Sequence, residues 1–161
     1  MTNATPITSA CGDEGLTIPT PVQSAFLRLL HALDRCIAAE RQLLETDAGD
    51  FDSARTACEM AGETLSMHFG ELLAMPESGP SDKSLRRLAF VMNSLLSIEN
   101  NADRAYFAAA LLDHAPLFDP GASCTTGPML RGLHLACLTQ TALLVDLRDP
   151  ASEVGYPELT P

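Results

Sequence analysis

Hydrophobic residues recur every three or four positions through most of the chain, which is the spacing of one face of an α-helix. The first run spans 20–45, and its apolar positions are Val22, Phe26, Leu29, Leu33, Ile37 and Leu44. Thr20, Pro21 and Gln23 form the pattern of a capping box with proline at the first helical position, which predicts that a helix begins there. Glu40 lies in the middle of the same stripe, where a charged side chain is costly to bury.

The same spacing predicts three more helices. A second begins near Asp50 and ends near Met75, where the turn-forming sequence MPESGPSD follows. A third extends from about 82 to about 114, and its inner face carries Leu88, Val91, Leu95, Ile98, Ala102, Tyr106 and Ala109. As one helix it is about 50 Å long against about 39 Å for the first, so either a break near Asn100–Asn101 or an overhang covered by the next loop is expected. A fourth, at 127–147, is apolar on nearly all sides.

These elements predict an all-α fold, an antiparallel, up-down-up-down four-helix bundle over residues 20–149. Three of the helices are amphipathic and two of the connections between them are short. The first nineteen residues are rich in Thr, Pro, Ser and Gly, and we expect 1–19 to be a mobile, disordered N-terminal arm. We expect the same of the C-terminal tail, 150–161.

The charge and the cysteine content of the chain limit its expected partners and location. The chain has 10 Lys and Arg against 21 Asp and Glu, a net charge of −11, which repels nucleic acid and anionic lipid, so neither is expected as a partner. The N-terminus has no basic segment followed by an apolar run, and no stretch is long enough for a membrane helix, so we expect a cytoplasmic protein. The five cysteines are an odd number without C-x-x-C spacing, which favours reduced thiols.

Three polar residues on inner helix faces raise the hypothesis of a metal site. Glu40 and Glu99 offer oxygen ligands and His134 a nitrogen ligand, a set that suits zinc, iron or manganese between facing helices. Thiolates could come from Cys36, Cys58 and Cys137. The Glu-x-x-His pairs of ferritin-like di-iron proteins are absent from the sequence, however, and by default we expect no cofactor.

The competing interpretation of these residues is structural. Glu40 would form an ion pair with Arg55 or Arg41, because a buried charge needs a partner. Glu99 would pair with Arg104 or Lys83, and His134 would be a neutral imidazole bonded to a carbonyl or hydroxyl. The cysteines in apolar stripes would then act as small hydrophobic residues.

A second hypothesis concerns His31, which shares a polar helix face with Arg28 and Arg35. A histidine between two guanidinium groups could accept a phosphoryl group in histidine phosphotransfer, since arginine compensates the added charge. The sequence LLHALDR lacks the Lys-Gly expected after such a histidine, so a solvated face is the simpler interpretation.

No catalytic motif or phosphate-binding loop is present in the sequence. The leading hypothesis is therefore a non-enzymatic helical protein, an adaptor or regulator that binds another protein or a second copy of itself as a homodimer. Its specific support is an exposed apolar patch, to which Phe90, Leu111 and Leu135 are predicted to contribute from the outer faces of their helices.

Overall fold

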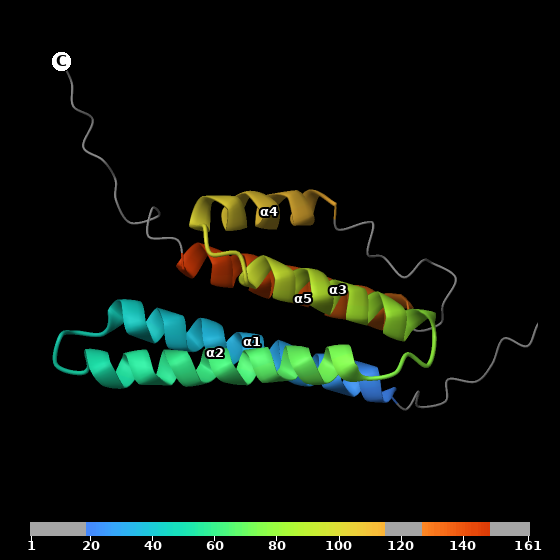
Figure 1. The fold of residues 1–161 in the computed structure, drawn as a ribbon, viewed down its shortest axis with the longest axis horizontal. Helices are drawn as coiled ribbons and strands as arrows, with labels where there is room; N and C mark the ends of the chain where they lie inside the picture. The colour runs from blue at the N-terminus through green and yellow to red at the C-terminus, as the bar shows by residue number, and fades with distance from the viewer. Residues whose placement is uncertain (1–18, 115–126, 149–161) are drawn as a thin grey trace, which may run out of the picture.

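The structure, a computed structural model, describes residues 19–114 and 127–148, which form five α-helices (Figure 1). The helices are α1 (Pro21–Glu45), α2 (Phe51–Ala74), α3 (Pro80–Leu96), α4 (Asn101–Asp113) and α5 (Gly127–Leu147). No strand occurs in these ranges, so the predicted all-α class is confirmed for them. None of the described helices is both long and apolar enough to span a membrane. The predicted arms, 1–19 and 150–161, fall outside the described residues except for Pro19.

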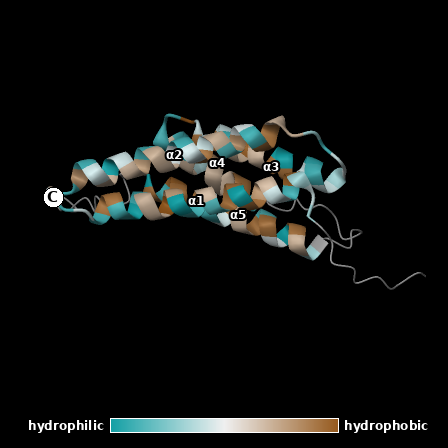
Figure 2. Ribbon diagram, turned by 90° about the horizontal axis from the view of Figure 1, so that it is seen from below, coloured by the Kyte–Doolittle hydropathy of each residue, from teal (hydrophilic) through white to brown (hydrophobic). Residues whose placement is uncertain are grey.

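The helices are arranged in three layers (Figure 1). α1 and α2 form the first layer, α3 and α5 form the second, and α4 lies on the side of the second layer that faces away from the first. Seen from below, α1 and α5 lie on one side and α2 and α3 on the other (Figure 2). α4 packs mainly on α5 and α3, and it buries one side chain, Ala108.

The predicted third helix is two helices, which corrects the number of helices from four to five. α3 ends at Leu96, and α4 then runs back in the opposite direction (Figure 1). Two features hold this reversal: the Asn100 side chain caps α4 by accepting a hydrogen bond from Asp103 N at 3.1 Å, and the Arg104 guanidinium donates to the carbonyl of Ile98. Of the two alternatives expected from sequence, the break near Asn100–Asn101 is therefore confirmed.

The break also changes which residues face inward. Ala102, Tyr106 and Ala109 were expected to continue the inner face of α3, but all three are exposed, and the side chain that α4 buries is Ala108. Four non-helical residues between α3 and α4 reset the helical phase, so the face that packs on α5 is a different one.

The extra reversal alters the direction of the last helix. In the predicted up-down-up-down order the last helix is antiparallel to the first, whereas α5 runs parallel to α1 (Figure 1). Gln140 donates a hydrogen bond to Asp34 at 2.5 Å, and Arg148 donates to Glu40 at 2.6 Å, so positions advance along both helices in the same sense. The predicted alternation therefore fails at its last step because α4 supplies one reversal more.

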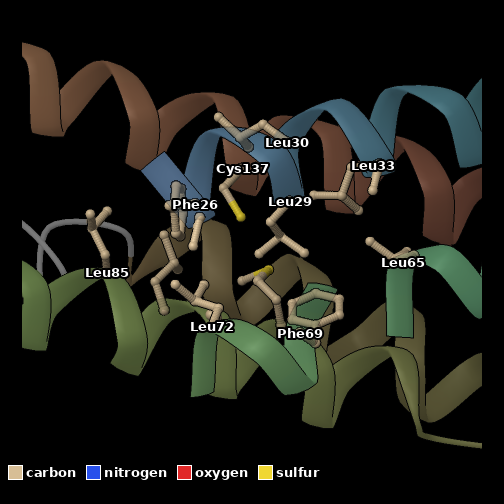
Figure 3. Packing of buried hydrophobic residues seen from close by; sticks show 14 of the residues in the cluster. Phe26, Leu29, Leu30, Leu33, Leu65, Phe69, Leu72, Leu85 and Cys137 are labelled. Carbon is tan, nitrogen blue, oxygen red and sulfur yellow. The ribbon is translucent and has the colours of Figure 1, made fainter. Parts of the chain in front are cut away.

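The core is built from leucine and phenylalanine on α1, α2, α3 and α5 (Figure 3). Its largest fully buried side chains include Phe26, Leu29, Leu33, Phe69, Leu72, Leu85, Leu88, Met92, Leu130 and Leu144. Each contributes about 1.5–3 kcal/mol by leaving water. A second, small cluster of Leu95, Ala108 and Val145 joins α4 to the main body. The core therefore confirms the inner face predicted for α1 from Val22 to Ile37, whereas Leu44, at the end of the same predicted face, is 53% exposed.

The start of α1 is fixed by the predicted capping box. Gln23 N donates to Thr20 Oγ1 at 3.1 Å, and Thr20 N donates to Gln23 Oε1 at 3.0 Å. The Thr20 hydroxyl also donates to Asp82 at 2.7 Å, and the other Asp82 oxygen accepts from Ser78 N at 3.0 Å. Asp82 is 1% exposed, so one buried carboxylate ties the start of α1 to the turn before α3.

Candidate functional site

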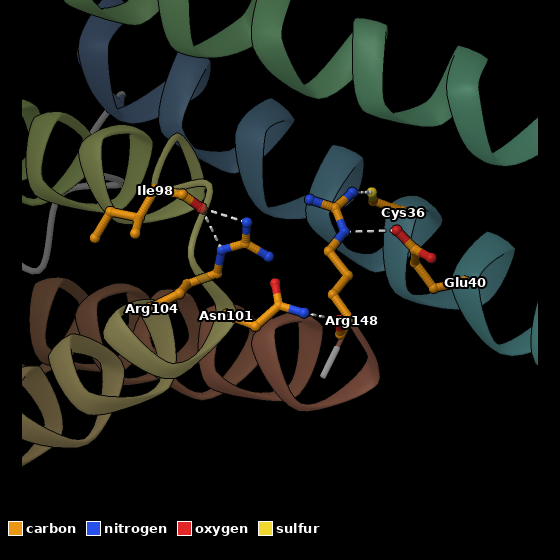
Figure 4. Close-up of polar contacts among 6 residues, drawn as sticks. All are labelled: Cys36, Glu40, Ile98, Asn101, Arg104 and Arg148. Carbon is orange, nitrogen blue, oxygen red and sulfur yellow. Dashed lines mark hydrogen bonds and ion pairs between the residues drawn. The ribbon is translucent and has the colours of Figure 1, made fainter. Parts of the chain in front are cut away.

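Glu40 is held by an arginine from the end of the chain's last helix. Arg148 Nε lies 2.6 Å from Glu40 Oε1, and the two side chains are 27% and 13% exposed (Figure 4). Of the partners expected from sequence, Arg55 instead pairs with Asp52 and Glu59 on the surface of α2. The interpretation of Glu40 as half of an ion pair is therefore confirmed, with a different partner.

Two thiols lie beside this ion pair. Arg148 Nη2 donates to Cys36 Sγ at 3.4 Å, and the Cys58 thiol donates to the Glu40 carboxylate. Burial raises the pKa of Cys36, and the charge of Glu40 adds to this while Arg148 opposes it. Burial and Glu40 raise the pKa of Cys58 to about 11. Both thiols are therefore protonated at neutral pH, which makes them poor nucleophiles.

The residues of the metal hypothesis do not form a common site. Glu99 is exposed in the connection between α3 and α4, rather than on an inner helix face as expected. Its suggested partner Arg104 donates to the carbonyl of Ile98 instead. His134 is 5% exposed, and its Nε2 lies 3.3 Å from the Ser84 hydroxyl.

His134 and Glu40 also lie at different levels along the helix axes. Fourteen positions separate His134 from Arg148, the partner of Glu40, or about 21 Å along a helix axis. Within residues 19–114 and 127–148, no group of three or more His, Cys, Asp or Glu side chains is placed to hold a metal ion. His134 instead has the hydroxyl contact expected of a structural histidine.

His31 lies at a small cavity between α1 and α2. The cavity has a volume of about 150 Å³ and is lined by Arg28, His31, Ala32, Arg35, Thr64 and His68. The exposed polar face predicted on α1 is therefore completed by two polar residues of α2. His68 Nδ1 lies 3.2 Å from Glu71 Oε2, so that imidazole has a carboxylate partner.

A larger, apolar recess lies between α3 and α4. It has a volume of about 610 Å³ and is lined by Val91, Ser94, Leu95, Ile98, Phe107, Ala110, Leu111 and His114. We call this recess the α3–α4 groove. Its size falls within the usual range of ligand pockets, about 300–1,000 Å³. The reversal between α3 and α4 creates it, because α4 folds back beside α3 without closing against it.

Large apolar side chains are exposed around the α3–α4 groove. Phe90 is 61% exposed and lies one turn before Ser94, whereas Tyr106 is 71% and Phe107 54% exposed. The rings of Tyr106 and Phe107 meet edge to face, with their centroids 5.7 Å apart. Phe90 was predicted from sequence as part of an exposed patch, and Leu135 is also exposed, at 64%.

Leu111 differs from these two, because it is half-buried and lines the groove. Sequence reasoning missed Phe107, whose contribution depends on the changed phase of α4. The signal that could have found it is the pair Asn100–Asn101: starting a new helix there places Phe107, Leu111 and His114 on one face.

Comparisons of the chain with protein-family models, with curated proteins and with solved structures gave no match.

Proposed function

We propose that this protein acts by binding other proteins and that the α3–α4 groove is its docking site for an amphipathic helix. The observation that carries the proposal is an apolar recess of about 610 Å³ bordered by exposed aromatic rings. Soluble monomers rarely leave large contiguous apolar surfaces exposed unless these surfaces bind something. The proposal extends to a role as an adaptor or regulator, in which binding is the activity.

The shape of the groove favours a helix as its occupant. α3 and the connection after it line the groove from Val91 to Ile98, and α4 with its C-cap residue lines it from Phe107 to His114. The α4 wall spans two helical turns, or about 10 Å along its axis. A docked helix presents anchors at positions i, i+3 or i+4, and i+7 over the same length. Aromatic residues such as Phe107 are typical of the anchor points in interfaces of this kind.

Charge favours a basic partner. The chain carries a net charge of −11, and Glu99, Asp103 and Asp113 are exposed in or beside α4. Complementary charge accelerates encounter and disfavours partners of like charge. We therefore propose a partner helix with an apolar stripe and lysine or arginine on its flanks.

The proposal is tested with a synthetic helix as the probe. A fluorescent peptide of about four turns, with leucine at i, i+4 and i+7 and lysine elsewhere, is titrated with the protein and followed by anisotropy. Binding is expected, and Phe107→Asp should weaken it at least tenfold, because it places a charge on an apolar wall. Met60→Asp is the matched control: Met60 is a 62% exposed residue on α2, outside the groove, and its substitution should leave binding unchanged.

Three results would contradict the proposal. Equal loss with Phe107→Asp and Met60→Asp would mean that added negative charge acts nonspecifically. Equal binding of a peptide with the same composition in scrambled order would remove the requirement for an amphipathic helix. A concentration-dependent dimer in sedimentation velocity that Phe107→Asp disperses would show that the groove holds a second copy of the chain.

A further inference from the structure

The cavity between α1 and α2 concentrates positive charge in an acidic protein. Two of the chain's ten Lys and Arg residues, Arg28 and Arg35, line it together with two of its four histidines. The cavity lies between the two helices of the first layer, whereas the α3–α4 groove lies between α3 of the second layer and α4. A chain with a net charge of −11 does not need this cluster of basic residues to stay soluble. Solubility therefore does not explain why these residues lie together.

The two arginines are available to a ligand. Within the described ranges neither Arg28 nor Arg35 forms an ion pair. Of the carboxylates near the cavity in sequence, Asp34 accepts from Gln140, Glu71 contacts the lining residue His68, and Glu63 is exposed beside Thr64. Arginine in this situation binds phosphate through two parallel N–H donors, which gives strong and oriented contacts.

We propose that this cavity binds a phosphate dianion, either as free phosphate or as a phosphate monoester. Its volume of about 150 Å³ leaves room for a group of five heavy atoms. Arg28 and Arg35 lie about two turns apart on α1 and donate from the two ends, with His31 between them and His68 facing them from α2. The proposal concerns reversible binding only, no bond to His31 forms, and it stands independently of the α3–α4 groove.

The test is a titration of the whole protein with inorganic phosphate, followed by the backbone amide resonances in nuclear magnetic resonance. Chloride at the same ionic strength serves as the reference. Phosphate is expected to shift the amides around Arg28–Arg35, Thr64 and His68 in a saturable way. Arg28→Gln and Arg35→Gln should each weaken binding about tenfold, since each removes a charge-assisted hydrogen-bonding group.

Arg41→Gln is the matched control, because Arg41 is an exposed arginine on the same helix that does not line the cavity. An equal loss with Arg41→Gln would overturn the proposal, as would shifts that chloride reproduces. All three arginines lie on the surface, and circular dichroism verifies that each variant is folded. A parallel titration with O-phosphoserine identifies the source: tighter binding of the monoester assigns the site to a phosphorylated partner group, and tighter binding of inorganic phosphate assigns it to the free ion.

Discussion

Replacing Arg148 by methionine should destabilise the fold by about 2 kcal/mol. The substitution keeps an unbranched apolar chain of similar length but removes the charge that faces Glu40 at 2.6 Å. Exposed ion pairs contribute about 0.2–1 kcal/mol, and removing one partner of a fully buried pair costs about 3–5 kcal/mol. With side chains 27% and 13% exposed, this pair lies between the two limits. The melting temperature should fall by about 6 °C, because 1 kcal/mol corresponds to about 2–4 °C for a protein of this size.

The measurement is a double-mutant cycle by urea denaturation at neutral pH, using Arg148→Met, Glu40→Gln and the double variant. Glu40→Gln should cost about 1 kcal/mol, because glutamine still accepts a hydrogen bond but leaves the guanidinium without its counter-charge. The double variant should lose less than the sum of the two by about 1 kcal/mol, since neither charge is then left alone. Arg55→Met should change stability by no more than about 0.5 kcal/mol, because its ion pairs are exposed.

Additive losses, equal to the sum within about 0.5 kcal/mol, would refute this reasoning. They would mean that the two charges do not stabilise each other and that Arg148 contributes through the packing of its aliphatic part.

Two further predictions concern buried polar groups. Asp82→Ala should cost about 2 kcal/mol in the same urea assay, because the Thr20 hydroxyl and the Ser78 amide lose their acceptor; a loss no larger than that of an exposed substitution would contradict this. Burial raises the pKa of Cys137 from 9.0 to about 12. Between these two pH values the folded state keeps a thiol proton that the unfolded state loses. The stabilisation from this thiol is therefore complete below pH 9 and declines as the pH rises towards 12. Unfolding free energies measured from pH 8 to pH 11 should decline less steeply in Cys137→Ala than in the wild type, and identical slopes would contradict the assignment.

The helices could be predicted from sequence wherever the residues that start, line or end them are close together in the chain. The capping box at Thr20 and the period of apolar residues identified α1, and the Pro and Gly residues between α2 and α3 identified the turn. The break after Leu96 could be predicted only as one of two alternatives, because the apolar period continues from Leu95 through Ile98 to Ala102. Packing decides there: Ala108 gains a contact with Val145 and Leu95 only if α4 folds back.

The partner of Glu40 could not be found in sequence for a related reason. Arg148 lies 108 positions away, and it reaches Glu40 only because α5 runs parallel to α1. The direction of α5 depends on the number of reversals before it, so one missed helix moved the expected partner to Arg55. The carboxylate's need for a cation was predictable from burial alone, whereas the identity of the cation depended on the topology.

The same reversal links the stability of α4 to the occupation of its groove. α4 has thirteen residues and buries one side chain, Ala108, and a helix of this length is marginal on its own in water. Phe107 lies on the groove side of α4 and is 54% exposed, so an occupant would bury apolar surface that the fold leaves in water. A ligand that binds only the folded arrangement stabilises it by mass action, so a partner helix in the groove would hold α4 against α3 and α5. The weak packing of α4 and its exposed aromatic residues thus have one origin, a helix with more apolar residues than the other four described helices cover.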